Sequence, residues 1–228
     1  ALLPVWLAEA GRIRYAVAGE VNEGPWRAAL RQVELCGVGR IVQVRQGDGL
    51  QVVRSGEVDT VVIAGMGGAL ICSILERGGE VLRTVRRPVL QPTAGAAAVR
   101  CWLISRRWVL TAEEIVKEDG KFYEIVVAER KPNAEEWNAR LYAQATLPCG
   151  LTADETLLLE MGPHLLREGN EWLVQMWEEQ RAKLARILQE MENATSATTK
   201  RKKENYRKRD HQIREVLECL QTVKTSSK

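Results

Sequence analysis

The sequence predicts an α/β fold: a mostly parallel sheet that ends in an antiparallel hairpin, followed by a helical region. Short β-branched runs alternate with helical segments as far as residue 131, as in βαβ units. Two extended runs around an Asp-Gly turn then close the sheet. Beyond residue 170, apolar residues recur at heptad spacing, which is typical of long paired helices.

Strands and helices are expected to alternate through the first part of the chain. The expected strands are Tyr15–Gly19, Ile41–Val44, Asp59–Ala64 and Pro88–Gln91. Helical spacing of apolar residues follows three of them, at Trp26–Val33, Leu70–Leu75 and Ala96–Leu103. Parallel strands need such crossover helices, so this order predicts a parallel sheet.

The sheet is expected to end in a hairpin formed by Trp108–Lys117 and Phe122–Glu129, with Asp119-Gly120 in its turn. This ending is more typical of a class I methyltransferase than of a nicotinamide-dependent Rossmann enzyme. The sequence also has no GxGxxG before a helix, which disfavours the nicotinamide enzyme further.

A change of pattern at Lys131-Pro132 predicts two domains, residues 1–131 and 132–228. Short helices are expected up to residue 170, and a polar turn at 193–199 is expected to join two long helices into a hairpin. The first seam comprises Leu173, Trp177, Gln180, Leu184, Ile187 and Met191, and the second Tyr206, Ile213, Leu217, Leu220 and Lys224. Pairing between two chains is left open by this pattern.

The composition excludes several classes of protein. Of 228 residues, 45% are hydrophobic and 28% charged, which is ordinary for a globular protein. No apolar run is long enough to cross a membrane. Five cysteines at irregular spacing predict reduced thiols in a cytoplasmic protein. The only histidines are His164 and His211, which excludes a Ser-His-Asp triad or a His-rich metal site in the first 160 residues.

Basic residues are concentrated just after the expected polar turn. They are predicted to contact phosphates, and they comprise Lys200, Arg201, Lys202, Lys203, Arg207, Lys208 and Arg209. A solvated helix end paired with acidic neighbours explains the same cluster equally well, since the net charge is only +3.

Glycines and acids follow three of the expected strands, at 19–21, 47–49 and 65–68. Ligands of open α/β sheets bind where such carboxyl ends gather. Glu20 suits the two hydroxyls of a ribose, Asp48 can accept an adenine amino group, and the Gly-Met-Gly-Gly run offers a wall with few side chains. One such loop alone is typical of a simple turn or cap. Three in this order favour a nucleotide-like ligand.

Five segments in order are similar to one family: AGEVNEGPWRAAL (18–30), QGDGLQVV (46–53), DTVVIAGMGGALI (59–71), LQPT (90–93) and KEDGKFYEIVVAE (117–129). Together they closely resemble the bacterial tRNA adenine-N1 methyltransferases that modify adenine 22, the TrmK family. The resemblance covers essentially the whole chain, because that family also carries a helical coiled-coil region. It implies S-adenosyl-L-methionine as methyl donor and tRNA as substrate.

The resemblance also implies residue roles. Glu20, with Val21, would bind the ribose. Gly47, Asp48 and Gly49 would lie by the adenine of the cofactor, and Ala64, Gly65 and Met66 near its methyl group. Gln91 and Pro92 would line the pocket for the target base, although Gln91 is equally suited to closing the strand's backbone. No metal is implied.

The family opens with a strand and an acidic, glycine-containing loop that run into Tyr-Leu-Pro. Ala1-Leu2-Leu3-Pro4 matches only the end of that string, so we expect the first strand and the loop under the cofactor's methionine part to be missing. A catalytically inactive, methyltransferase-like RNA-binding protein is therefore the alternative.

Adenine N1 has an exposed lone pair, so the expected reaction needs orientation rather than an acid–base pair. N1 lies on the Watson–Crick edge of adenine, so the base must be unpaired or flipped out before it can react. Of the seven tryptophans, Trp6, Trp26 and Trp102 are expected in the core, and Trp172 and Trp177 in the helical region.

Overall fold

The computed structural model describes residues 1–147, 149–191 and 196–226, with only the backbone at 197 and 223–226. The first elements are α1 (Leu2–Glu9), β1 (Ala16–Glu20), α2 (Glu23–Leu35) and β2 (Val42–Gln46). β1 and β2 pair in parallel, from Ala16 with Val42 to Glu20 with Gln46. They form a sheet of their own, covered by a small core that includes Val5, Val33 and Val42.

The second sheet has the order β3–β4–β6–β5. Its strands are β3 (Thr60–Gly67), β4 (Arg87–Ala94), β5 (Val109–Glu118) and β6 (Lys121–Glu129). β3 and β4 are parallel, whereas β6 pairs antiparallel with both β4 and β5. The predicted hairpin is confirmed, and Asp119 and Gly120 in its turn have φ values of 48° and 72°, as a tight hairpin turn requires.

The strands do not form one continuous sheet. β1 exchanges backbone hydrogen bonds with β2, and β3 with β4, but the two sheets are not joined. Both β1 and β3 are therefore edge strands. The short helix η1 (Gly49–Val52) contacts both units, and its Leu50 is buried in the core of the larger one.

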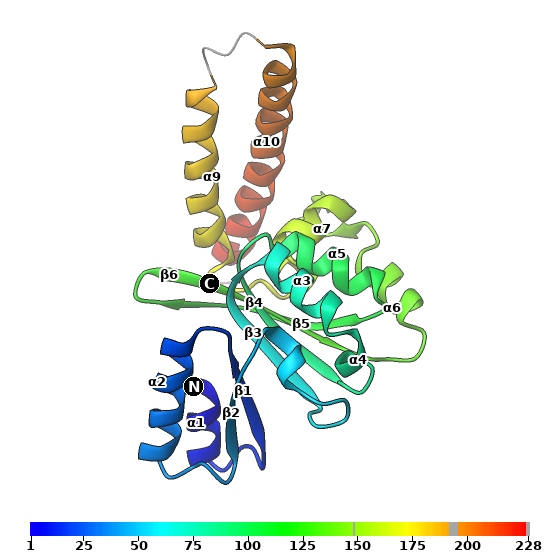
Figure 1. Cartoon of the computed structure of the whole chain (residues 1–228). Helices are drawn as coiled ribbons and strands as arrows, with labels where there is room; N and C mark the ends of the chain where they lie inside the picture. Colours follow the sequence, from blue (N-terminus) through cyan, green and yellow to red (C-terminus); the bar gives the residue numbers. More distant parts are fainter. Residues whose placement is uncertain (148, 192–195, 227–228) are drawn as a thin grey trace.

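Helices α3 (Gly68–Arg77), α4 (Gly79–Leu82) and α5 (Ala96–Ser105) follow β3 and β4. A helical region comes after the hairpin: α6 (Ala134–Leu141), α7 (Glu155–Met161) and α8 (Pro163–Glu168), with the two-residue strands β7 (Ala145–Thr146) and β8 (Thr152–Ala153) between α6 and α7. The chain ends in α9 (Leu173–Glu190) and α10 (Ala197–Ser226), which lie side by side and project from the sheet as a long arm (Figure 1).

The arm is a helical hairpin within one chain, as predicted. Arg181 of α9 pairs with Asp210 of α10 over 2.7 Å, and Gln221 donates to Glu178 over 2.9 Å. Burial of the predicted seam is uneven, because Leu173, Ile213, Leu217 and Leu220 are buried at the base while Ile187 and Tyr206 are exposed. Residues 193–195 of the expected turn and the side chain of Lys224 lie outside the described residues.

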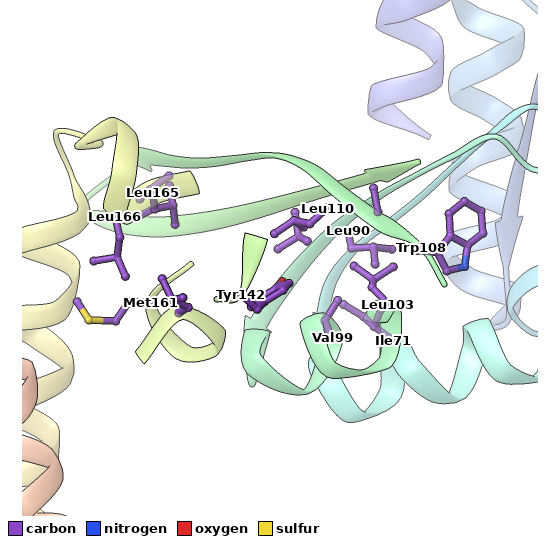
Figure 2. Packing of buried hydrophobic residues seen from close by; sticks show 14 of the residues in the cluster. Ile71, Leu90, Val99, Leu103, Trp108, Leu110, Tyr142, Met161, Leu165 and Leu166 are labelled. Atoms are coloured by element: carbon purple, nitrogen blue, oxygen red, sulfur yellow. The ribbon is translucent and has the colours of Figure 1, made fainter. Parts of the chain in front are cut away.

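The larger core is continuous from the sheet into the helical region. Figure 2 shows it from Trp108 and Leu90, past Tyr142, to Met161, Leu165 and Leu166. α6–α8 thus share apolar burial with the sheet, which holds the base of the arm in place. The division at Lys131 remains a prediction, since the core does not break there.

Two expectations are wrong. Trp6 is 61% exposed rather than part of the core, because α1 is buried only on the face that carries Val5 and Ala8. Cys149 and Cys219 are bonded as a disulfide, although reduced thiols were expected. They are 70 residues apart, and only the fold brings their Cα atoms to 5.5 Å, so spacing could not reveal the pair.

Candidate functional site

The first two predicted loops lie next to each other at the carboxyl ends of β1 and β2. The N–H of Gly47 donates to the carbonyl of Glu20 over 3.0 Å. A Cβ at Gly47 would lie 2.6 Å from the side chain of Val52, so this position has room for glycine alone. Glu20 is half-buried and the neighbouring Val21 exposed, which leaves this edge accessible to a ligand.

The second loop is held against α3. The carboxylate of Asp48 pairs with Arg77 over 2.6 Å, with both side chains nearly half exposed. Gly49 has a φ of +56°, and a Cβ there would lie 2.9 Å from Ile74. Asp48 therefore keeps accessible acceptor capacity, but Arg77 already fixes its orientation.

The end of β3 is an exposed strip with few side chains. Val61 and Ile63 are buried, whereas all of 64–67 is exposed. Gly65 has a φ of +75°, which favours glycine. A Cβ at Gly68 would lie 2.3 Å from the carbonyl oxygen of Gly95, so the start of α3 packs closely on the loop after β4.

Gln91 joins this strip to the end of β4. Its Oε1 accepts a hydrogen bond from the N–H of Gly65 over 2.8 Å, and its Nε2 donates to the carbonyl of Pro92 over 3.2 Å. Pro92 is buried. The side chain of Gln91 thus closes the backbone between two strand ends, which is one of the two roles expected for it, and it also lines an adjoining cavity.

These residues fit S-adenosyl-L-methionine. The exposed backbone of 64–67 allows close approach, Glu20 offers a carboxylate for hydroxyls, and Asp48 an acceptor for an amino group. Gly47 and Gly49 keep the second loop free of side chains. The first two predicted loops are in direct contact, and Asp48 and Arg77 tie the second loop to α3. Residues 64–66 lie in the other sheet.

Sequence reasoning missed a buried ion-pair cluster beside this site. Arg100 on α5 has no exposed surface and pairs with Glu113 and Glu124, with 2.5 Å between its Nη2 and Glu113. It also donates to the carbonyls of Leu159 and Glu160, which ties α7 to the sheet. The signal was present: Arg100 lies on the same apolar helical face as Ala96 and Leu103.

The cluster changes the ionisation of its members. Burial alone would lower the pKa of Arg100, but the carboxylates of Glu124 and Glu113 outweigh it and raise the pKa. Burial raises the pKa of Glu124 above its ordinary value, against the opposing effect of Arg100. Burial disfavours the charged form of each group, and an opposite charge nearby favours it. The nearby charges dominate for Arg100, and burial dominates for Glu124.

The predicted basic cluster lies along the outer part of α10. Lys200, Arg201, Lys202 and Lys208 are exposed there, as is Arg207, while Lys203 is half-buried. Arg209 differs, because its Nε donates to Glu160 of α7 over 2.7 Å and its side chain is only 15% exposed. Arg209 therefore anchors the arm to the body, and the other six are the candidates for phosphate contacts.

In the described part of the chain, no helix is long and apolar enough to cross a membrane. In the same residues, no group of three or more His, Cys, Asp or Glu side chains is placed to hold a metal ion.

The chain is similar to known tRNA methyltransferases. A tRNA (adenine(22)-N(1))-methyltransferase of Bacillus subtilis is 37% identical over 203 residues, which is 89% of this chain and 80% of the relative. The crystal structure of the B. subtilis M1A22 tRNA methyltransferase TrmK matches with a TM-score of 0.79 at 34% identity, over 94% of this chain and 87% of the other.

A second solved structure is a putative tRNA (m1A22) methyltransferase of Streptococcus pneumoniae, in complex with S-adenosyl-L-methionine. It matches with a TM-score of 0.75 at 33% identity, over 95% of this chain and 87% of the other. The fold is thus that of a class I, Rossmann-like methyltransferase with a C-terminal helical hairpin. The family model for TrmK, tRNA (adenine(22)-N(1))-methyltransferase, matches residues 1–219, and the chain belongs to this family.

Proposed function

We propose that this protein transfers a methyl group from S-adenosyl-L-methionine to N1 of adenine 22 in tRNA. The observation that carries the proposal is the contact between Gly65 and Gln91. This bond joins the strip that we assign to the cofactor to the strand end that we assign to the target base, which supports a direct transfer between two bound groups. The family to which the chain belongs supports the same reaction.

The chemistry asks little of ionisable side chains. The cofactor supplies a methyl group on a positively charged sulfur. As adenine N1 forms its bond to carbon, the carbon–sulfur bond breaks and its electron pair stays on sulfur, so the positive charge moves to the adenine. No proton has to leave first. The protein's task is therefore to align the two groups and exclude water.

Different parts of the chain have different tasks in this proposal. Residues 1–131 hold the cofactor, through Glu20, Asp48 and Ala64–Met66, and receive the base beside Gln91 and Pro92. Residues 132–228 hold the body of the tRNA through the exposed basic residues of α10. With tRNA as substrate, the protein acts in the cytoplasm.

The proposal is tested by methylation of unmodified tRNA, followed by mass analysis of the nucleosides and mapping of the modified position. A tRNA with guanine at position 22 is the control. The proposal expects 1-methyladenosine in the first tRNA and none in the second. Methylation at another position, or none at all, contradicts it.

The interruption of the sheet between β1 and β3 favours a second candidate, a methyltransferase-like protein that binds RNA without catalysis. Calorimetry with S-adenosyl-L-methionine separates the two functions. An enzyme releases or absorbs heat on binding the cofactor, whereas the RNA-binding scaffold gives no heat and still binds tRNA.

A further inference from the structure

A cavity of about 750 Å³ lies between the sheet and the arm. Its size is in the range of small-molecule and nucleotide sites. One wall is Gln91–Ala97, at the end of β4 and the start of α5, and a second is Gly120–Glu124 of the β5–β6 hairpin. The third comes from α9, at Met176, Trp177, Glu179, Gln180 and Lys183. The arm therefore forms part of the cavity that begins at Gln91.

The position of α9 over this cavity is held by aromatic and polar contacts at its base. The rings of Phe122 and Trp172 lie 6.4 Å apart. Lys117 donates to Gln175 over 3.1 Å and lies about 5 Å from both ring centroids (5.2 and 5.3 Å). These contacts join the hairpin to the residues just before and within the first turn of α9. The next turn, which contains Trp177, is thereby held beside the cavity.

Trp177 is unusual among the residues that line this cavity. Its indole is half-buried, and its Nε1–H is buried without a hydrogen-bond partner in the described part of the chain. The ring of Trp177 lines the nucleotide-sized cavity, and an aromatic ring there is a surface on which a base can stack.

The charges of the cavity suit a nucleotide. Lys183 of α9 is exposed and can meet a phosphate. Glu124 and Glu160 in the wall are already paired, with Arg100 and Arg209. These pairings hold the two carboxylates in fixed positions in the wall of the cavity.

We propose that α9 completes the acceptor site: the flipped target adenine enters this cavity and stacks on Trp177, while Lys183 contacts a phosphate of the same strand. The inference rests on the proposed function, since it deepens the account of how that function's substrate is held. It gives the arm a role at the reacting base, in addition to holding the body of the tRNA.

The test uses the full chain and a tRNA with 2-aminopurine at position 22, which emits weakly when stacked and strongly when unstacked. Trp177→Phe keeps a ring and Trp177→Leu keeps only apolar volume, while both remove Nε1. Emission of the bound tRNA should rise severalfold with the Leu variant and stay low with the Phe variant. Thermal unfolding of each variant verifies that it is folded.

Activity provides the second readout. With natural tRNA, Trp177→Leu should lower kcat/KM by roughly 5- to 150-fold relative to Trp177→Phe, the equivalent of ~1–3 kcal/mol of base stacking. Trp137→Leu is the matched control, because Trp137 lies on α6 outside the cavity and is 51% exposed. This control should leave both readouts unchanged.

A third variant changes an exposed side chain and leaves the packing of the core intact. Lys183→Ala, at an exposed position, should make the salt dependence of tRNA binding shallower by roughly 0.7–0.9 on a log–log plot, as expected for one phosphate contact. Equal 2-aminopurine emission from the Leu and Phe variants, with methylation of natural tRNA by the unaltered chain intact, overturns the stacking role alone. Absence of methylation by the unaltered chain contradicts the proposed function instead.

Discussion

The side-chain oxygen of Gln91 accepts a hydrogen bond from the backbone N–H of Gly65 over 2.8 Å, and so joins the carboxyl ends of β4 and β3. One of these ends is assigned to the target base and the other to the cofactor. Backbone pairing of β3 with β4 already holds the two ends together, and the side chain of Gln91 adds a bond where the register shifts between Ala64 and Met66. That makes Gln91 a positioning residue, whose loss disturbs alignment more than stability.

Replacement of Gln91 by Ala should lower kcat by about tenfold or more, because small misplacements of reacting groups can cost up to about 100-fold. The free energy of unfolding should change by less than about 1 kcal/mol, since Gly65 is exposed and water can replace the lost acceptor. Steady-state kinetics and urea unfolding measure the two effects. Gln144→Ala, at an exposed position in the helical region, is the control. An unchanged kcat would show that the contact does not align the site.

Asp48 provides a test of the cofactor edge. Asp48→Ala should weaken binding of S-adenosyl-L-methionine roughly 10- to 100-fold, the effect of losing a hydrogen bond to a charged group. Calorimetry gives the dissociation constant directly. Glu80→Ala is the matched control, because Glu80 is also a carboxylate paired with an arginine, Arg83, but lies on α4. Equal affinities for the two variants would remove Asp48 from the site.

The basic cluster should govern the salt dependence of tRNA binding. Changing Lys200, Arg201, Lys202 and Lys208 to Gln should lower affinity and make the log–log salt slope shallower by roughly 3, if each contacts a phosphate. The control removes four exposed cations from the small N-terminal unit instead: Arg12, Arg14, Arg31 and Arg40. Filter binding at several salt concentrations measures the slopes. The same slope for both variants would contradict a phosphate-binding role.

Arg100 should be essential for stability. Arg100→Met leaves Glu113 and Glu124 without their partner in a buried place, and should lower the free energy of unfolding by about 3–5 kcal/mol. Arg83→Met, which breaks an exposed ion pair with Glu80, should cost less than about 1 kcal/mol. Urea unfolding compares the two. Similar losses for both variants would mean that the buried cluster adds little.

The low pKa of Glu57 predicts that the folded protein loses stability in acid. Hydrogen bonds from Arg45 and from the backbone N–H of Arg54 hold the pKa of its carboxyl well below the ordinary value of 4.5. As the pH falls below that value, Glu57 binds a proton in the unfolded chain but not in the folded protein. The contribution of Glu57 to the free energy of unfolding is therefore complete above pH 4.5 and is lost progressively as the pH falls towards the lower pKa of the folded state.

The Glu57→Gln variant should accordingly be less stable at neutral pH and lose less stability in acid. Urea unfolding from about pH 7 to about pH 3 measures the two slopes. Glu80→Gln serves as the control, because that side chain is 77% exposed. Parallel pH profiles for Glu57→Gln and the unaltered protein would show that another group causes the acid sensitivity.

Much of this protein is encoded in short stretches of its sequence. The hairpin turn depends on Asp119 and Gly120, two neighbouring residues that adopt positive φ, and the strands and helices follow from local alternation and helical spacing. The motifs 18–30, 46–53 and 59–71 identified the family without a structure. Such features are readable because their physical cause lies within a few residues.

Other features were decided by tertiary structure alone. Arg209 was grouped with its basic neighbours, but the fold places it against Glu160, 49 residues away, and so makes it an anchor. The Cys149–Cys219 disulfide, the burial of Arg100 and the cavity shared by Trp177 and the end of β4 depend equally on distant segments. A side chain's partner decides whether its charge is solvated, paired or left for a ligand, and only packing in three dimensions selects that partner.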